Sequence, residues 1–354
     1  MKQQDIREAS LSSLSELLSS WGQPSFRAKQ IYAWLWQHNA QSFEEMTNLP
    51  ISLREKLNEY FIFLNITLDK QQISEDGTIK ARFRLHDGFN IESVLIPVLD
   101  ENRFTVCVSS QVGCSLTCSF CATGKMKRER NLTAGEIVSQ VNAINNLCLE
   151  HFNKKLTNVV YMGMGEPLAN EEPVWESIVR LHEDVGLSAR HLTVSTVGII
   201  PGINRLASRP LPVNLAVSLH AANDNLRDAL VPINRRYPIK ALMEACAGFL
   251  ESKNRRLTFE WALIDGVNDR PSDAIELAQI CRSFRVPAHV NLIPLNPTPG
   301  YEVRGSSRNQ VQAFCDQLVG MGANATIRRN RGTDIAAACG QLAAGQPVQI
   351  SRSK

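Results

Sequence analysis

The sequence has no apolar run of about 18 residues or more, and no apolar stretch follows the polar first seven positions. A membrane-spanning or secreted chain needs one of these features. Neither sign of charge dominates, because 38 basic and 35 acidic residues leave a formal net charge of +3. We therefore expect a cytoplasmic protein with no membrane partner, in which any polyanion is bound by local clusters of basic residues.

The remaining composition is that of an ordinary folded protein. Hydrophobic residues make up 44% and charged residues 21% of the 354 positions, which argues against a disordered or fibrous chain. At roughly 150 residues per domain, this length predicts about two domains.

Hydrophobic periodicity divides the chain. Residues 1–65 repeat apolar positions at intervals of three and four, which predicts a small helical domain. Residues 66–99 alternate apolar and polar positions on both sides of Asp87-Gly88, which predicts a β hairpin linker. Residues 100–342 are expected to form the core domain, and residues 343–354 a polar tail.

Within the core domain, β-rich runs alternate with helical patterns, so we expect an α/β fold with a parallel sheet. A closed or partial barrel is favoured over an open, doubly wound sheet, because each polar motif follows the carboxyl end of an expected strand. The expected strands cover residues 104–109, 158–163, 192–196, 214–218, 257–263, 289–294 and 324–329, and the expected helices include 133–151, 239–252, 274–284 and 307–319.

Three of the nine cysteines stand on one short loop, as Cys114, Cys118 and Cys121 in a CxxxCxxC arrangement. Three thiolates can hold a 4Fe-4S cube and leave one iron without a protein ligand. A zinc site is the alternative, but structural zinc takes four ligands, and no second CxxC or HxxxH lies nearby. Cys148, Cys246, Cys281 and Cys315 stand alone in apolar stretches and are expected to be small buried hydrophobic residues.

This loop resembles the hallmark of the radical S-adenosylmethionine (SAM) superfamily, and four segments are similar to the RlmN family of that superfamily. The segments are residues 107–114, 162–168, 216–220 and 334–342. The resemblance extends over nearly the whole chain and implies a partial (β/α) barrel of the radical SAM type. One departure is Lys127 to Arg130, where many relatives carry a Gly-Phe pair.

The resemblance implies methylation of carbon 2 of one adenine in 23S rRNA and of the adenine beside the anticodon in tRNA. That carbon is electron-poor and cannot attack a methyl sulfonium, so a thiol carries the methyl group and a radical derived from a second SAM activates it. By resemblance, Cys339 becomes S-methylcysteine, Cys107 forms a transient disulfide with it, and Glu92 accepts a proton. Cys107 also shares the polar face of its expected strand with Thr105.

The remaining site residues are transferred from the family. Its SAM contacts correspond to Gly165, Glu166, Ser195, Ser218, Leu219, His220 and Asn296, and its cluster ligands to Cys114, Cys118 and Cys121. An electron donor such as flavodoxin or ferredoxin is also implied. Basic residues cluster at the expected active face and suit an RNA backbone: Lys125, Lys127, Arg128, Arg130, Arg235, Arg236, Arg328, Arg329 and Arg331.

Three other functions compete with this one. The paralogous Cfr family shares most of these motifs but methylates carbon 8 of the same rRNA adenine. A radical SAM enzyme acting on a small molecule would leave the amino-terminal helical domain, with its Arg27, Lys29, Trp34 and Trp36, without a purpose. A non-catalytic iron–sulfur or zinc module that binds RNA is the third.

Overall fold

The computed structural model describes residues 3–286, 288–296 and 304–342, so the polar tail expected at 343–354 lies outside the described residues. The chain begins with a small helical unit in which a short parallel pair of strands joins its two ends. Ser10 starts the first helix by accepting a hydrogen bond from the Ser13 backbone N–H. The elements are β1 (Gln4–Asp5), α1 (Leu11–Ser20), α2 (Phe26–Trp36), α3 (Ile51–Tyr60) and β2 (Phe61–Ile62), with a 3-10 turn at Ile6–Glu8.

This unit packs directly against the larger domain. The Arg7 guanidinium donates to the Ser139 hydroxyl at 2.9 Å. The Arg180 guanidinium lies over the rings of Tyr32 and Trp36, at 4.8 and 5.6 Å from their centroids. Trp36 is only 2% exposed, so it serves the core rather than an RNA surface.

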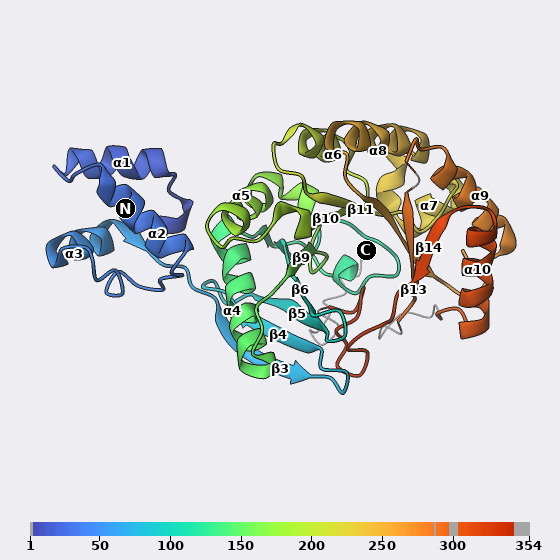
Figure 1. Ribbon diagram of the computed structural model, residues 1–354, viewed down its shortest axis with the longest axis horizontal. Helices are drawn as coiled ribbons and strands as arrows, with labels where there is room; N and C mark the ends of the chain where they lie inside the picture. The colour runs from blue at the N-terminus through green and yellow to red at the C-terminus, as the bar shows by residue number, and fades with distance from the viewer. Residues whose placement is uncertain (1–2, 287, 297–303, 343–354) are drawn as a thin grey trace, which may run out of the picture.

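A ten-stranded sheet forms the body of the molecule (Figure 1). Its order is β14-β13-β12-β11-β10-β9-β6-β5-β4-β3; the pairs from β6 to β14 are parallel, and those from β3 to β6 are antiparallel. The strands are β3 (Thr67–Ile73), β4 (Ile79–Arg84), β5 (Asn90–Val98), β6 (Arg103–Cys107), β9 (Asn158–Tyr161), β10 (Leu192–Thr196), β11 (Asn214–Ser218), β12 (Leu257–Leu263), β13 (His289–Pro294) and β14 (Asn324–Ile327), while β7 (Gln111–Val112) and β8 (Arg130–Asn131) form a separate pair.

Helices cover the outer face of the curved parallel part, as Figure 1 shows. Thr133 and Glu136 form a capping box that begins α4. The helices are α4 (Ala134–Phe152), α5 (Glu171–Glu183), α6 (Ile200–Ser208), α7 (Asp224–Leu230), α8 (Ile239–Lys253), α9 (Pro271–Arg282) and α10 (Arg308–Gly320), with 3-10 turns at Thr123–Lys125, Pro167–Ala169, Ala189–His191 and Pro232–Arg235.

The predicted fold class is confirmed: a helical unit and antiparallel strands precede a parallel sheet that curves into a partial barrel. Because β14 and β3 are the two edge strands, the sheet does not close. The carboxyl ends of its parallel strands meet at one rim. In the described part of the chain, no helix is both long enough and apolar enough to span a membrane.

Candidate active site

The three-cysteine loop is tightly folded between β7 and β8. Gly113 has φ +74°, and a Cβ there would lie 2.1 Å from the Lys127 carbonyl oxygen, so only glycine fits immediately before Cys114. The Cys114 sulfur accepts a hydrogen bond from the Leu116 N–H at 3.4 Å. Such bonds stabilise thiolate ligands of iron–sulfur clusters.

The sulfurs of this loop share one cavity, which Cys114, Cys118 and Cys121 all line. Burial raises the pKa of the Cys114 thiol to about 12 and raises the pKa values of Cys118 and Cys121 as well. Thiolates in this place therefore need a strongly positive partner. In the described residues, no three Cys, His, Asp or Glu side chains converge as ligands of a single metal ion. The donor set fits a larger 4Fe-4S cluster better than zinc.

The same cavity is lined by the segment that follows β9. A Cβ on Gly163 would lie 2.6 Å from the Val108 carbonyl oxygen, and one on Gly165, at φ +96°, would lie 2.8 Å from the Gln111 nitrogen. The two glycines therefore let this segment lie directly against the end of β6. Glu166 follows with its carboxylate accepting from the Leu168 and Val197 N–H groups at 3.0 and 2.9 Å. Burial still raises the pKa of Glu166 to about 7.

His220 lies opposite, at the end of β11, with φ +60°. Its Nδ1 accepts a hydrogen bond from the Ala262 N–H at 2.9 Å, which leaves the proton of the neutral ring on Nε2. Burial and the nearby charge of Arg227 lower the pKa of His220 to about 3, so the ring is neutral at physiological pH. Phe120 packs on it edge to face, at 4.5 Å between ring centroids.

Five of the seven SAM contacts expected from the sequence line this cavity: Gly165, Glu166, Ser195, Ser218 and His220. The other two, Leu219 and Asn296, do not. Leu219 is fully buried in the core, and Asn296 accepts a hydrogen bond from Asn330 at 2.7 Å. The cavity thus combines carboxylate and hydroxyl groups with the three thiols, which suits a small cationic ligand with a ribose.

Sequence reasoning missed Arg227, which ties two strand ends together beneath this cavity. Its guanidinium is fully buried and donates to the carbonyl oxygens of Val197, Ser218 and Leu219 at 2.5, 3.2 and 3.1 Å. An arginine within an ordinary polar helix gives no signal of this role in one sequence. Glu260 and Arg328, which also line the cavity, were likewise not assigned to it.

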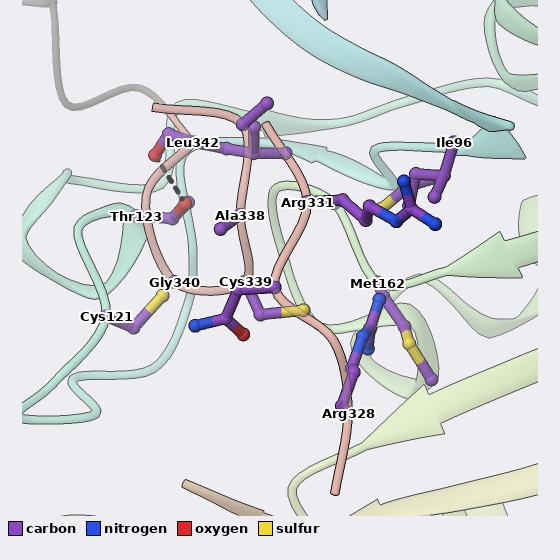
Figure 2. A pocket seen from close by; sticks show the side chains of 14 residues that line it. Ile96, Cys121, Thr123, Met162, Arg328, Arg331, Ala338, Cys339, Gly340 and Leu342 are labelled. Carbon is purple, nitrogen blue, oxygen red and sulfur yellow. Dashed lines mark hydrogen bonds between the residues drawn. The ribbon is translucent and has the colours of Figure 1, made fainter. Parts of the chain in front are cut away.

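Cys107 and Cys339 line a second cavity next to the first, together with Cys121. Cys107 ends β6, and burial, reinforced by the nearby Cys339, raises the pKa of its thiol to about 12. All nine cysteines are free thiols. Figure 2 shows the Cys339 sulfur turned into this space, with Arg331, Met162 and Arg328 around it.

The loop that carries Cys339 is held on two sides. On one side, the Ala122 N–H donates to the Gly340 carbonyl oxygen at 2.8 Å, and the Thr123 hydroxyl donates to the Leu342 carbonyl oxygen at 3.1 Å (Figure 2). These contacts join it to the cluster loop. On the other side, Asp76 accepts from the Gly332 N–H at 3.1 Å, which joins it to the turn between β3 and β4.

Glu92 lies on β5 and is 6% exposed. Its carboxylate lies 4.0 Å from the Lys80 ammonium, which also donates to the carbonyl oxygen of Ala336 at 3.2 Å. Alternation along the strand places Glu92 on the same face as Val94, the register partner of Cys107, and Ile96, which lines the Cys339 cavity. The structure thus brings Glu92 to the Cys339 loop through one lysine.

Within the described part of the chain, only some residues of the predicted basic cluster are free of internal ion pairs and could contact a polyanion. Arg130 forms ion pairs with Asp87 at 2.5 Å and with Glu136 at 2.7 Å, so its charge is neutralised within the protein. Lys127 and Arg128 are exposed beside the cluster loop. Arg331 lines the Cys339 cavity.

A partial parallel barrel with three cysteines on a loop after its first strand defines a radical SAM enzyme, and residues 108–278 match the radical SAM superfamily. Residues 4–63 match the "Ribosomal RNA large subunit methyltransferase N-terminal domain". The chain belongs to the RlmN family of dual-specificity RNA methyltransferases.

Individual relatives match over nearly their full length. The chain is 45% identical to a probable dual-specificity RNA methyltransferase RlmN of Chloroflexus aurantiacus, over 99% of this chain and 96% of the relative. The RlmN of Anaeromyxobacter dehalogenans is 46% identical, over 96% and 92%. A crystal structure of a radical SAM methyltransferase from Sphaerobacter thermophilus superposes with a TM-score of 0.89 at 47% identity, covering 96% of this chain and 99% of that one.

Proposed function

We propose that this chain methylates carbon 2 of adenine in RNA, at adenine 2503 of 23S rRNA and adenine 37 of tRNA, through a methyl group carried on Cys339. The observation that carries the proposal is the shared cavity of Cys107 and Cys339, next to the cavity of the three-cysteine loop. A thiol carrier is needed because the target carbon is not nucleophilic.

In this proposal, Cys114, Cys118 and Cys121 hold a 4Fe-4S cluster, and Gly165, Glu166, Ser195, Ser218 and His220 contact SAM. Leu219 and Asn296 remain proposed SAM contacts, although neither lines the cavity of the three-cysteine loop. When bound, the cluster and SAM would supply a methyl group and a radical that abstracts hydrogen. Two features support this assignment. Gly163 and Gly165 have no side chain that would fill the cavity, and the neutral His220 ring supplies an N–H donor on Nε2.

Three side chains would then act on the methyl group and the base. The Cys339 sulfur accepts the methyl group and presents it to the adenine. The Lys80 ammonium lies beside the ionised Glu92 carboxylate, which then takes the proton that the adenine carbon loses and becomes neutral. Cys107 attacks the Cys339 sulfur and forms a disulfide with it, while the bond from that sulfur to the transferred carbon breaks. The electron pair of that bond stays on the RNA side, and uptake of a proton completes the methyl group of the released RNA.

The partners complete the proposal. RNA is the substrate, and a one-electron donor such as flavodoxin or ferredoxin reduces the cluster. Because both RNA substrates and reduced thiols belong to the cytoplasm, we place the activity there. We also assign RNA docking to the helical unit of residues 1–65.

The test is methylation of unmodified rRNA fragments and tRNA by the reconstituted protein, followed by mass analysis of nucleosides. We expect a methyladenosine from both RNAs. Alanine in place of Cys114, Cys118 or Cys121 should abolish cleavage of SAM to 5'-deoxyadenosine, because two thiolates hold a cube poorly. Cys246→Ala, which changes a buried thiol on α8, is the matched control and should retain it. Cleavage of SAM without any methylated nucleoside in either RNA would contradict the proposal.

A further inference from the structure

Arg328 lies in the wall between the two cavities. It follows β14 directly, and its backbone N–H donates to the Leu292 carbonyl oxygen at 2.8 Å, which fixes it to β13. Its side chain lines the Cys339 cavity and also the cavity of the three-cysteine loop. Figure 2 shows this side chain beside Cys339, with Met162 next to it. The guanidinium is therefore close to the point where the methyl group would arrive.

The ionisable groups around this guanidinium are two thiols and one acid. The nearby Cys339, Glu260 and Cys107 raise the pKa of Arg328. Glu260 is 5% exposed and is held by a hydrogen bond from Asn291 at 2.8 Å. The other ionisable groups that line the Cys339 cavity are Cys107, Cys121, Arg328 and Arg331. Cys339 also lines the cavity of the three-cysteine loop, where Glu166, His220 and Glu260 are further ionisable groups.

We propose that Arg328 is the counter-charge that keeps the Cys339 sulfur reactive for methyl acceptance. This role rests on the proposed function of Cys339 as methyl carrier. Arginine suits it because a guanidinium keeps its proton in any protein environment, whereas a lysine next to thiols and partly out of water loses its charge more easily.

The charges balance through the step. The Cys339 thiol first gives its proton to solvent. The thiolate then forms a bond from sulfur to the methyl carbon, while the bond from that carbon to the sulfonium sulfur breaks and its electron pair stays on the departing thioether. An anion and a cation become two neutral thioethers. The methylated Cys339 is then no longer attracted to Arg328 and can turn toward the base.

The experiment measures alkylation of Cys339 by iodoacetamide at neutral pH in the cluster-loaded protein, by peptide mass analysis. Arg328→Gln should slow this reaction on the order of tenfold, the scale of one charge interaction at short range. Arg328→Lys should recover only part of the rate, because a lysine at this position loses its charge more easily. Arg285→Gln, which removes an exposed charge at the end of α9, is the matched control and should alkylate like the wild type. Equal rates for wild type and Arg328→Gln would overturn the proposal.

A second measurement needs no variant that could fold poorly. A positive charge beside Cys339 should favour the anionic reagent iodoacetate over neutral iodoacetamide by a few fold, relative to the same cysteine in the denatured chain. An unchanged ratio would overturn the proposal. Neither measurement uses SAM or RNA, so both test the role of Arg328 alone. If Cys339 instead fails to become methylated when SAM is present, that result refutes the proposed function.

Discussion

The Ser74 hydroxyl donates a hydrogen bond to the Asp334 carboxylate at 2.6 Å. These residues join the turn between β3 and β4 to the loop that carries Cys339, and the Glu75 N–H donates to the other carboxylate oxygen at 3.3 Å. These bonds also lower the pKa of Asp334. The antiparallel strands at the sheet edge therefore do more than extend the sheet, because they anchor the proposed catalytic loop.

This contact predicts coupled losses of turnover. Ser74→Ala and Asp334→Ala should each lower methylation of Cys339 several-fold, because the loop loses one of the contacts that hold it to the turn between β3 and β4, and the double variant should be no worse than the more damaging single one. Asp265→Ala, an acid outside both cavities, is the control. The fraction of Cys339 that carries a methyl group, measured together with the melting temperature of each variant, checks this. If the losses of methylation in the two single variants simply add in the double variant, the coupling is contradicted.

The two outlying thiols should fail at different steps. Cys339→Ala should keep its iron and never acquire an S-methyl group. Cys107→Ala should accumulate RNA attached covalently through Cys339, because the adduct forms but no thiol resolves it. Gel electrophoresis of the protein with labelled RNA measures the adduct. Wild-type methylation in both variants would exclude the two-cysteine scheme.

Glu166 should make the stability of the cluster-free chain depend on pH. Burial raises the pKa of Glu166 from its ordinary 4.5 to about 7. Between these values the unfolded chain has lost the proton that the folded chain still holds, so the free energy of unfolding falls as pH rises through this window. The total is about 3 kcal/mol. Urea unfolding of Glu166→Gln should lack this fall, and parallel pH curves for the two proteins would show that the carboxyl titrates normally.

The helical unit should contribute basic and aromatic contacts to RNA. Lys29 is exposed on α2, and the Lys56 ammonium lies 4.6 Å from the centroid of the Trp21 ring. Lys29→Glu and Lys56→Glu should each weaken RNA binding and reduce its salt dependence by about one charge. Lys240→Glu, exposed on α8, is the control. The iron–sulfur spectrum should stay unchanged throughout. Equal affinity in all variants would place RNA docking elsewhere.

Much of the fold could be predicted, because its strands are apolar runs bounded by polar residues. The bounds of β10, β11, β12 and β13 agree with the prediction. The sequence did not reveal α5, α6 or α7. Two of them, α5 and α6, are clearly amphipathic, so their periodicity is present in the sequence and was overlooked. Only α7, with seven residues, is too short for its periodicity to indicate a helix.

The site was predicted less completely, for a physical reason. Its cysteines stand in a recognisable motif, whereas Arg227 and the contact between Ser74 and Asp334 depend on which segments meet in the folded chain. Trp36 shows the same limit, because the sequence places it in the helical domain, and only the structure shows that it packs against Arg180 in the core.

The last prediction concerns which carbon receives the methyl group. Carbon 2 and carbon 8 of adenine are both flat, unactivated aromatic carbons, so radical addition does not choose between them. The choice depends on which edge of the base faces the Cys339 sulfur. Membership of the RlmN family, which includes the matched amino-terminal domain at residues 4–63, favours carbon 2. The Cfr-like alternative uses the same cysteines.

Chromatography of nucleosides from modified RNA, run against 2-methyladenosine and 8-methyladenosine standards, decides between the two. We expect 2-methyladenosine from both rRNA and tRNA. Cys107→Ala supplies the control, because its trapped adduct, after digestion, should carry the thioether link on the same carbon. A dominant 8-methyl peak would contradict the assignment of the target carbon, while Cys339 would still be the methyl carrier, because the geometry that selects the carbon is separate from the chemistry that activates the methyl group.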